Sequence, residues 1–244
     1  MTIIQIVIPV YNEALNIEET CTKIQKLIVK FGNQIFFTIF NDGSTDESGK
    51  ILEKNLKINK DKIKIISLRK NMGLNYIERS MINNFKEKYI LFLPADNRFS
   101  LEALISYISL ILENTENYDI FQATPQGELR GKFRESISKI VAKLVELQLF
   151  KLKKFETLGL ICLKRDLYNC YPKLKFRWGG TIFYRSIVAC VYSRVRFIPI
   201  AQQSREPFNF KNLIRMIKRM PSAVMALLIF PWLTYIKVKK LPTF

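Results

Sequence analysis

Apolar runs of strand length alternate with helical patterns through the first 123 residues, and this alternation constrains the fold more than any other feature of the chain. Residues 3–9 read Ile-Ile-Gln-Ile-Val-Ile-Pro, a β-branched run typical of a strand buried on both faces of a parallel sheet. Apolar residues then recur at helical spacing over residues 14–31, and residues 35–40 are again apolar and β-prone. A strand, a helix and a second strand in this order predict a βαβ unit with parallel strands.

The alternation continues beyond this unit. It predicts further helices over residues 45–56, 74–86 and 100–113, and further strands over residues 63–68, 89–93 and 118–123. Such a repeat predicts an α/β fold with a doubly wound, mostly parallel sheet, in which ligands bind at the carboxyl ends of the strands. Beyond residue 126 the pattern changes, and we expect a long amphipathic helix over residues 132–151 and strands over residues 158–163 and 195–200.

The composition limits the chemistry that the chain can perform. With 244 residues, 48% of them hydrophobic, the chain can bury the core of one large domain with a small appendage. No histidine occurs, which excludes Ser-His-Asp, Cys-His and His-ligated metal chemistry. The cysteines lie far apart and form no CxxC pair, which favours buried free thiols in a reducing, cytosolic setting. They are Cys21, Cys162, Cys170 and Cys190.

The positive charge of the chain is confined to its second half. Residues 1–129 carry 15 Lys and Arg against 16 Asp and Glu, a net charge of −1, whereas residues 130–244 carry 24 against 5, a net charge of +19. A basic excess in one half indicates that this half meets a polyanion, such as an anionic membrane surface or a phosphate-bearing lipid. A nucleic-acid partner is not expected, because the basic half has neither a recognition helix nor an aromatic-basic strand motif.

The carboxyl-terminal stretch predicts a membrane-associating tail over residues 205–244, following a domain over residues 1–204. Residues 210–219 have one apolar and one basic helical face, and residues 220–236 are 17 residues without a charge. This apolar stretch contains two prolines and is shorter than the roughly 20 residues that usually span a bilayer, so an interfacial or re-entrant anchor is as plausible as a span. Packing back on the domain, or a homo-oligomer contact, is the alternative. No signal sequence is expected, because the first strand begins at residue 3.

Two polar turns follow the first two predicted strands. Residues 8–13 read Ile-Pro-Val-Tyr-Asn-Glu, and residues 40–46 read Phe-Asn-Asp-Gly-Ser-Thr-Asp. Both turns lie at carboxyl strand ends, where Gly43 permits a tight turn and the neighbouring polar side chains can bind a nucleobase and a ribose. The alternative is an ordinary Asx turn that caps the next helix through Ser44 or Thr45.

Together, the two turns resemble the family-two glycosyltransferases of the GT-A fold, whose first two strands end in Pro-Val-Tyr-Asn-Glu and Asp-Asp-Gly-Ser-Thr-Asp. Residues 69–73, Arg-Lys-Asn-Met-Gly, are similar to the family's Arg-Asn-x-Gly turn. The resemblance implies a nucleotide-sugar donor held by residues 1–128, with residues 129–204 as the acceptor half. The residues that it implies for the nucleotide are Pro9, Tyr11, Asn12, Glu13, Asn41, Asp42, Ser44, Asn71, Ala95 and Asp96.

The chain departs from the family at the Asp-x-Asp motif that holds a divalent cation against the diphosphate. Here the sequence reads Pro-Ala-Asp-Asn-Arg, so that Asp96 matches the second aspartate and Pro94 replaces the first. Mg²⁺ or Mn²⁺ is the cofactor that the resemblance implies, with Asp96 and Asn97 as the protein ligands. Two alternatives are that Arg98 or a lysine supplies the counter-charge without metal, and that Asp96 caps the helix that begins near Ser100.

The second half is most similar to the polyprenol-phosphate glycosyltransferases, of the dolichol-phosphate mannosyltransferase type. Arg134 with Ser138 matches their Arg-x-x-x-Ser, and Ile-Pro-Ile at residues 198–200 with Arg205 matches their Val-Pro-Ile strand and loop arginine. The resemblance implies that both arginines meet phosphate groups, a task suited to a planar bidentate cation. Two matches are missing, because residues 124–125 lack the family's arginine and the Gly-x-Ser-Lys after the loop arginine reads Phe-Asn-Phe-Lys.

These observations predict a glycosyltransferase that moves a sugar from a nucleotide-diphosphate donor to a polyprenyl phosphate at the cytoplasmic face of the membrane. Residues 176–186 contain no carboxylate where relatives that act on sugar hydroxyls place a catalytic base, and an anionic phosphate acceptor needs none. Asp96, Arg134 and Arg205 are the expected catalytic residues. The alternative function is a degenerate, non-catalytic nucleotide-sugar or polyanion binder.

Overall fold

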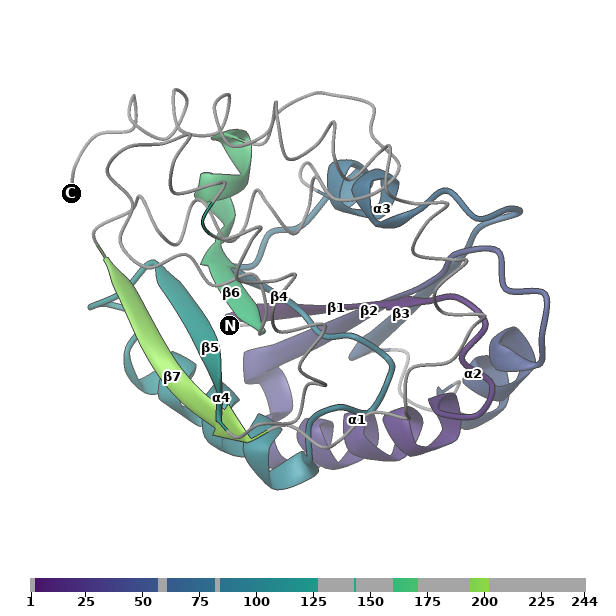
Figure 1. Cartoon of the computed structure of the whole chain (residues 1–244), viewed down its shortest axis with the longest axis horizontal. Coiled ribbons are helices and arrows are strands. Elements are labelled where there is room, and N and C mark those ends of the chain that lie inside the picture. The colour runs from purple at the N-terminus through teal and green to yellow at the C-terminus, as the bar shows by residue number, and fades with distance from the viewer. Residues whose placement is uncertain are drawn as a thin grey trace.

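A computed structural model of the chain describes residues 3–56, 61–81, 84–126, 160–170 and 194–201, together with Lys143 (Figure 1). The strands are β1 (Ile4–Val10), β2 (Ile35–Asn41), β3 (Ile63–Ser67), β4 (Tyr89–Phe92), β5 (Ile120–Gln126), β6 (Ile161–Lys164) and β7 (Val195–Ala201). The helices are α1 (Ile17–Phe31), α2 (Ser48–Leu56), α3 (Leu74–Met81) and α4 (Leu101–Glu113), with short 3₁₀ helices η1 (Gly32–Gln34) and η3 (Arg165–Cys170).

The described strands form one seven-stranded sheet in the order β3-β2-β1-β4-β6-β5-β7. Strands β1 to β4 run parallel to one another, and β7 runs parallel to β5. Strand β6 is antiparallel to both of its neighbours, β4 and β5. The predicted α/β fold with a mostly parallel sheet is confirmed, and the reversed β6 lies between the amino-terminal strands and the pair β5 and β7.

Helices pack on both faces of the sheet. Helices α1, α2 and α4 lie along one face, and α3 lies over the other (Figure 1). The buried residues of α1 recur at helical spacing and include Ile17, Cys21, Ile24 and Leu27. Each fully buried aliphatic side chain of this kind stabilises the fold by roughly 1.5–3 kcal/mol. The apolar periodicity of residues 14–31 therefore reports the face of the helix that covers the sheet.

The observed boundaries differ from the predicted ones at several helix ends. Helix α1 begins at Ile17 rather than residue 14, and α2 begins at Ser48 rather than residue 45. The prediction of a helix through residue 86 is wrong, because α3 ends at Met81 and residues 84–88 are not helical. The Asn84 Nδ2 donates a hydrogen bond to the main-chain oxygen of Ser80, a carbonyl near the end of α3.

Several predicted features lie outside the described residues. They are the helix over residues 132–151, apart from the single described residue Lys143, the amphipathic segment over residues 210–219 and the apolar stretch over residues 220–236. Among the helices that the structure describes, none combines the length and apolar character needed to cross a membrane. Cys21 and Cys162 are buried free thiols, as predicted, and burial raises the pKa of Cys21 to about 11.

Candidate functional site at the carboxyl edge of the sheet

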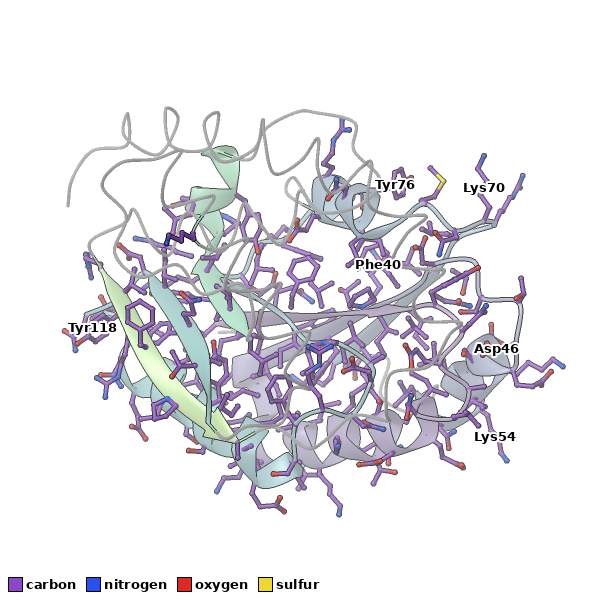
Figure 2. All side chains as sticks on the ribbon, in the orientation of Figure 1. Phe40, Asp46, Lys54, Lys70, Tyr76 and Tyr118 are labelled. Carbon is purple, nitrogen blue, oxygen red and sulfur yellow. The ribbon has the colours of Figure 1, made fainter. Side chains whose placement is uncertain are left out.

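The loops that follow β1, β2, β3 and β4 leave the sheet at the same edge, because these four strands are parallel. The residues that end β1 and β2 are in register, with Val10 opposite Asn41. Figure 2 shows Asp46, from the loop after β2, and Lys70, from the loop after β3, on the same side of the molecule. Ligands of open α/β sheets bind in the crevice outside this edge, so the four loops together are the candidate site.

The loop after β1 is fastened to the loop after β2 by a ladder of hydrogen bonds. The main-chain N–H of Asn12 donates to the Ser44 Oγ at 3.1 Å, and the Asn12 Oδ1 accepts the Thr45 main-chain N–H at 2.8 Å. The main-chain N–H of Glu13 donates to the Ser48 Oγ at 2.9 Å. Asn12 has a φ of 54°, a left-handed conformation that asparagine tolerates better than most residues. The two motifs therefore form one connected structure.

Asp46 closes this ladder and starts α2. Its Oδ1 accepts the main-chain N–H of Ser48 at 3.0 Å, and its Oδ2 accepts that of Ala14 at 3.1 Å. Partial burial acts to raise the pKa of the Asp46 carboxyl, but the hydrogen bonds from Ser48 and Ala14 favour the ionised form and bring the pKa below its ordinary value. The cap of α2 is therefore Asp46, and neither Ser44 nor Thr45 has that role.

Asp42 ties the loop after β2 to the loop after β3. The side chain is buried, and its two oxygens accept the main-chain N–H groups of Met72 and Gly73 at 2.7 and 2.9 Å. Gly43 makes the approach of the two loops feasible, because it has a φ of 67° and an added Cβ would lie 2.4 Å from the main-chain carbon of Lys70. Only glycine fits such a position without strain.

Asn41 lies at the end of β2, with its side chain buried at the base of the loop. Its Oδ1 accepts the main-chain N–H of Ser44 at 3.1 Å, an Asx turn that shapes the loop. Tyr11, by contrast, is 42% exposed at the rim, and Asn12 is also exposed. The rim therefore combines buried polar groups that fix the backbone with exposed side chains that a ligand can reach.

The loop after β4 carries a charged pair. The Arg98 Nε donates to both carboxylate oxygens of Asp96, at 2.9 and 3.2 Å, and the Arg98 Nη2 donates to the Asp96 Oδ2 at 2.5 Å. The two side chains are 21% and 20% exposed, so the pair is largely shielded from water. Helix α4 is capped by Ser100, whose Oγ accepts the main-chain N–H of Ala103. The alternative that Asp96 is the cap of this helix is wrong.

Asn97 contacts α1 and the residue that precedes it. Its Nδ2 donates to the main-chain oxygen of Asn16 at 2.7 Å, and its Oδ1 accepts hydrogen bonds from the Thr20 Oγ1 at 3.0 Å and the Lys23 Nζ at 3.4 Å. The main-chain oxygen of Ala95 is also within hydrogen-bond distance of the Thr20 hydroxyl, at 3.2 Å, and shares its single proton with Asn97. These contacts hold the loop after β4 against the loop after β1.

The donor set of this loop does not fit a divalent cation. Mg²⁺ and Mn²⁺ favour carboxylate and other hard oxygen ligands in near-octahedral geometry. Here Pro94 offers no side-chain ligand, both oxygens of Asp96 are engaged by a guanidinium, and the Asn97 oxygen lies beside the Lys23 ammonium. Within the described ranges, no group of three or more acidic or cysteine side chains gathers at one point.

The structure brings most of the sequence-predicted nucleotide residues to this edge and leaves their role as a prediction. Residues 9–13 and 41–44 lie at the ends of β1 and β2 and in the loops after them, residues 95–96 lie in the loop after β4, and Asn71 precedes the amides that bind Asp42. The predicted residues Arg134 and Arg205 lie outside the described residues. Sequence reasoning missed the pairing of Asp96 with Arg98, although their spacing of two residues in a loop was a usable signal.

The sequence profile described as glycosyl transferase family 2 matches residues 5–189, which is more than half of the chain. A curated relative, an undecaprenyl-phosphate 4-deoxy-4-formamido-L-arabinose transferase from Klebsiella pneumoniae (strain 342), is 24% identical over 143 residues. That match covers 59% of this chain and 43% of the relative, so the chain spans less than half of the relative's length.

Solved structures share the fold at low sequence identity. Glucosyl-3-phosphoglycerate synthase from Mycobacterium tuberculosis in complex with uridine diphosphate is similar with a TM-score of 0.65 and 15% identity, over 95% of this chain and 80% of that one. Mannosyl-3-phosphoglycerate synthase from Rubrobacter xylanophilus has a TM-score of 0.67 and 14% identity, over 93% and 73%. Another structure of the mycobacterial enzyme contains Mn²⁺ with uridine diphosphate. The GT-A type of fold is confirmed, and the chain belongs to glycosyl transferase family 2.

Proposed function

We propose that this chain transfers a sugar from a nucleotide-diphosphate donor to a polyprenyl phosphate. The observation that carries the proposal is the connected rim of loops at the carboxyl edge of the sheet, where the family's two nucleotide motifs are joined by the hydrogen bonds of Asn12, Ser44 and Thr45. A preorganised polar rim at this edge suits a nucleoside diphosphate. Family membership and the uridine diphosphate in a structure with the same fold support the donor class.

The acceptor assignment has separate support. The curated relative acts on undecaprenyl phosphate by name, the second half of this chain has a net charge of +19, and residues 176–186 lack a carboxylate base. In the proposed step, an oxygen of the acceptor phosphate attacks the anomeric carbon and forms the new C–O bond. The bond from that carbon to the diphosphate oxygen breaks, and its electron pair leaves with the nucleoside diphosphate. No proton has to be removed from an ionised phosphate, so no base is needed.

A transfer assay tests the proposal. The full chain is incubated with a panel of labelled nucleotide sugars and with undecaprenyl phosphate, with 3-phosphoglycerate, or with no acceptor. We expect labelled sugar in the solvent-extracted lipid only when the lipid phosphate is present. Label on phosphoglycerate alone would move the acceptor to a small phosphorylated acid. If none of the nucleotide sugars is turned over under any of these conditions, the alternative function of a non-catalytic binder remains. The proline in the metal motif favours that alternative.

The proposed site of action is the cytoplasmic face of the membrane. Residues 205–244 carry eight Lys and Arg against the single acid Glu206, and each basic side chain near an anionic surface contributes roughly 1 kcal/mol. The apolar residues of 220–236 then supply burial that resists salt. Flotation with anionic vesicles of the full chain and of a chain ending at Gln203 tests this. If both proteins float equally, or if neither floats, residues 205–244 do not anchor the chain to the membrane.

A further inference from the structure

We propose that Arg98 takes the place of the divalent cation, so that the chain binds and releases its nucleoside diphosphate without metal. The inference rests on the proposed function, because it concerns the diphosphate of the same donor. It starts from the observation that the side chains of residues 94–98 do not offer the oxygen ligands that a divalent cation needs. The one carboxylate in this segment is already engaged by a guanidinium, since Arg98 donates to both oxygens of Asp96.

The charge balance of the loop agrees with this exchange. A dication held by two carboxylates has a net charge of zero, and a single guanidinium held by a single carboxylate has the same net charge. Pro94 removes one carboxylate and Arg98 supplies one positive charge, so the two changes compensate each other. A second carboxylate beside Arg98 would leave a net negative charge facing a diphosphate, which repels it. The proline is therefore the partner of the arginine and need not indicate lost function.

Asp96 binds one edge of the Arg98 guanidinium, and the N–H groups on another edge remain for a ligand. A guanidinium has five N–H donors, and Asp96 accepts from Nε and Nη2. The contacts of Arg98 within the described residues do not involve Nη1. The two N–H groups of Nη1 and the second N–H group of Nη2 can therefore form a bidentate pair with phosphate oxygens. Because Asp96 holds the side chain in place, little side-chain freedom is lost when the diphosphate binds.

The position of the loop also suits a diphosphate. Strand β4 lies beside β1 in parallel register, with Val7 opposite Phe92, so the loop after β4 leaves the same edge as the nucleotide motifs. The Asn97 Nδ2 donates to the main-chain oxygen of Asn16, which holds the loop against the one after β1. A charge placed at this point can stabilise the negative charge that develops on the leaving diphosphate.

Calorimetric titration of the full chain separates the possibilities. UDP, GDP, CDP and ADP are titrated in excess EDTA and again in Mn²⁺. We expect the nucleotide that binds to do so at least as tightly in EDTA as in Mn²⁺, because Mn²⁺ occupies the phosphate oxygens that Arg98 would bind. Binding that appears only with Mn²⁺ keeps the donor class and overturns this inference. Failure of every nucleotide to bind in either condition overturns the donor class, and the inference with it.

Substitutions sharpen the test. Arg98→Ala should weaken nucleotide binding in EDTA by about tenfold or more, the effect of losing a charge-assisted bidentate pair. Arg98→Lys should recover part of the affinity, because it restores the charge without the planar fork. The control is Arg79→Ala, which removes an exposed arginine from the last turn of α3 and should leave the affinity unchanged. Unchanged affinity of Arg98→Ala would refute the role of Arg98.

A gain of metal binding provides an independent readout. The double variant Pro94→Asp with Arg98→Ala restores two carboxylates two residues apart and removes the guanidinium. We expect its nucleotide binding to require Mn²⁺, and the free Mn²⁺ signal in electron paramagnetic resonance to fall when protein is added to Mn²⁺ and nucleotide. The wild type should leave that signal at the level set by the nucleotide alone. An equal fall with the wild type would contradict the proposal.

Discussion

Two loops at the same edge of the sheet use an aspartate in different ways. In the loop after β2, the buried Asp42 accepts hydrogen bonds from two main-chain N–H groups of the loop after β3. In the loop after β4, Asp96 is partly exposed and accepts hydrogen bonds from the side chain of Arg98. The first aspartate joins two segments of backbone, and the second holds a cation in place.

The difference shows that agreement with a motif does not determine what a residue contacts. Asp42 belongs to a motif that differs from the family's at one position, yet both of its oxygens shape the protein itself. Asp96 belongs to the motif that departs from the family, and its partner is a charged side chain that has donors to spare for a ligand. A carboxylate bound to backbone amides mainly stabilises the fold, whereas one bound to a guanidinium sets the local charge.

The largest expected effect is a difference in the free energy of unfolding between variants of the two aspartates. Asp42→Ala leaves two main-chain N–H groups without acceptors, one of them buried and one partly buried, and should lower the free energy of unfolding by about 3 kcal/mol. Asp96→Ala breaks a pair of which about a fifth is still exposed to water, and it should cost less, about 1–2 kcal/mol. Urea denaturation of both variants measures the difference. Equal losses would mean that Asp42 has no special structural role.

Two glycines test how closely the loop after β2 approaches the loop after β3. Gly43 lies in the loop after β2, and Gly49 lies in α2. Gly43→Ala should destabilise the protein by about 2 kcal/mol, because alanine is strained at a φ of 67° and its Cβ would meet the main chain of Lys70 and Asn71. Gly49→Ala lies in α2 and meets only the Asn41 side-chain amide, at 2.8 Å. The buried Asn41 side chain has to shift, but better helix propensity offsets part of that cost, so the loss should be smaller than at Gly43. Thermal denaturation compares the two, and a larger loss at Gly49 would contradict the close approach seen at Gly43.

The charged loop should show its role in affinity rather than in stability. Arg98→Ala should weaken nucleotide binding in EDTA by about tenfold, whereas Asp96→Asn should weaken it by only about two- to threefold, because the arginine and its charge remain. A metal site predicts the reverse order, since loss of its one carboxylate would abolish metal binding. Calorimetry on both variants, each checked for unchanged thermal stability, gives the order directly.

The smallest effect concerns pH and Asp46. Because the pKa of its carboxyl is lowered in the folded protein, its hydrogen bonds stabilise the fold above the ordinary value of 3.8 and are lost as the pH falls through the lower folded value. For an exposed side chain the contribution should be below about 1 kcal/mol. Urea midpoints from neutral to acid pH should fall slightly less for Asp46→Asn than for the wild type. Identical pH profiles would remove Asp46 as a stabilising cap.

Much of the candidate site could be predicted because strand ends and turn residues are local features. The apolar runs at residues 3–9 and 35–40 identify β1 and β2, and the polar residues directly after them must then lie at one edge of a parallel sheet. The predicted helix through residue 86 was wrong because its apolar periodicity continues past Met81, where α3 ends. Periodicity indicates which residues suit a helix and says little about where the backbone leaves it.

The sequence by itself therefore determined the family, the α/β alternation and the edge of the sheet at which the polar motifs gather. Only the tertiary structure decided the reversed direction of β6, because a four-residue apolar strand looks the same in either direction. It also decided the partners of the two aspartates. Asp42 meets amides about 30 residues away because β2 and β3 are neighbours in the sheet, and no local pattern records which strands are neighbours. Asp96 meets Arg98 because Asn97 is held against α1, a contact between segments about 80 residues apart.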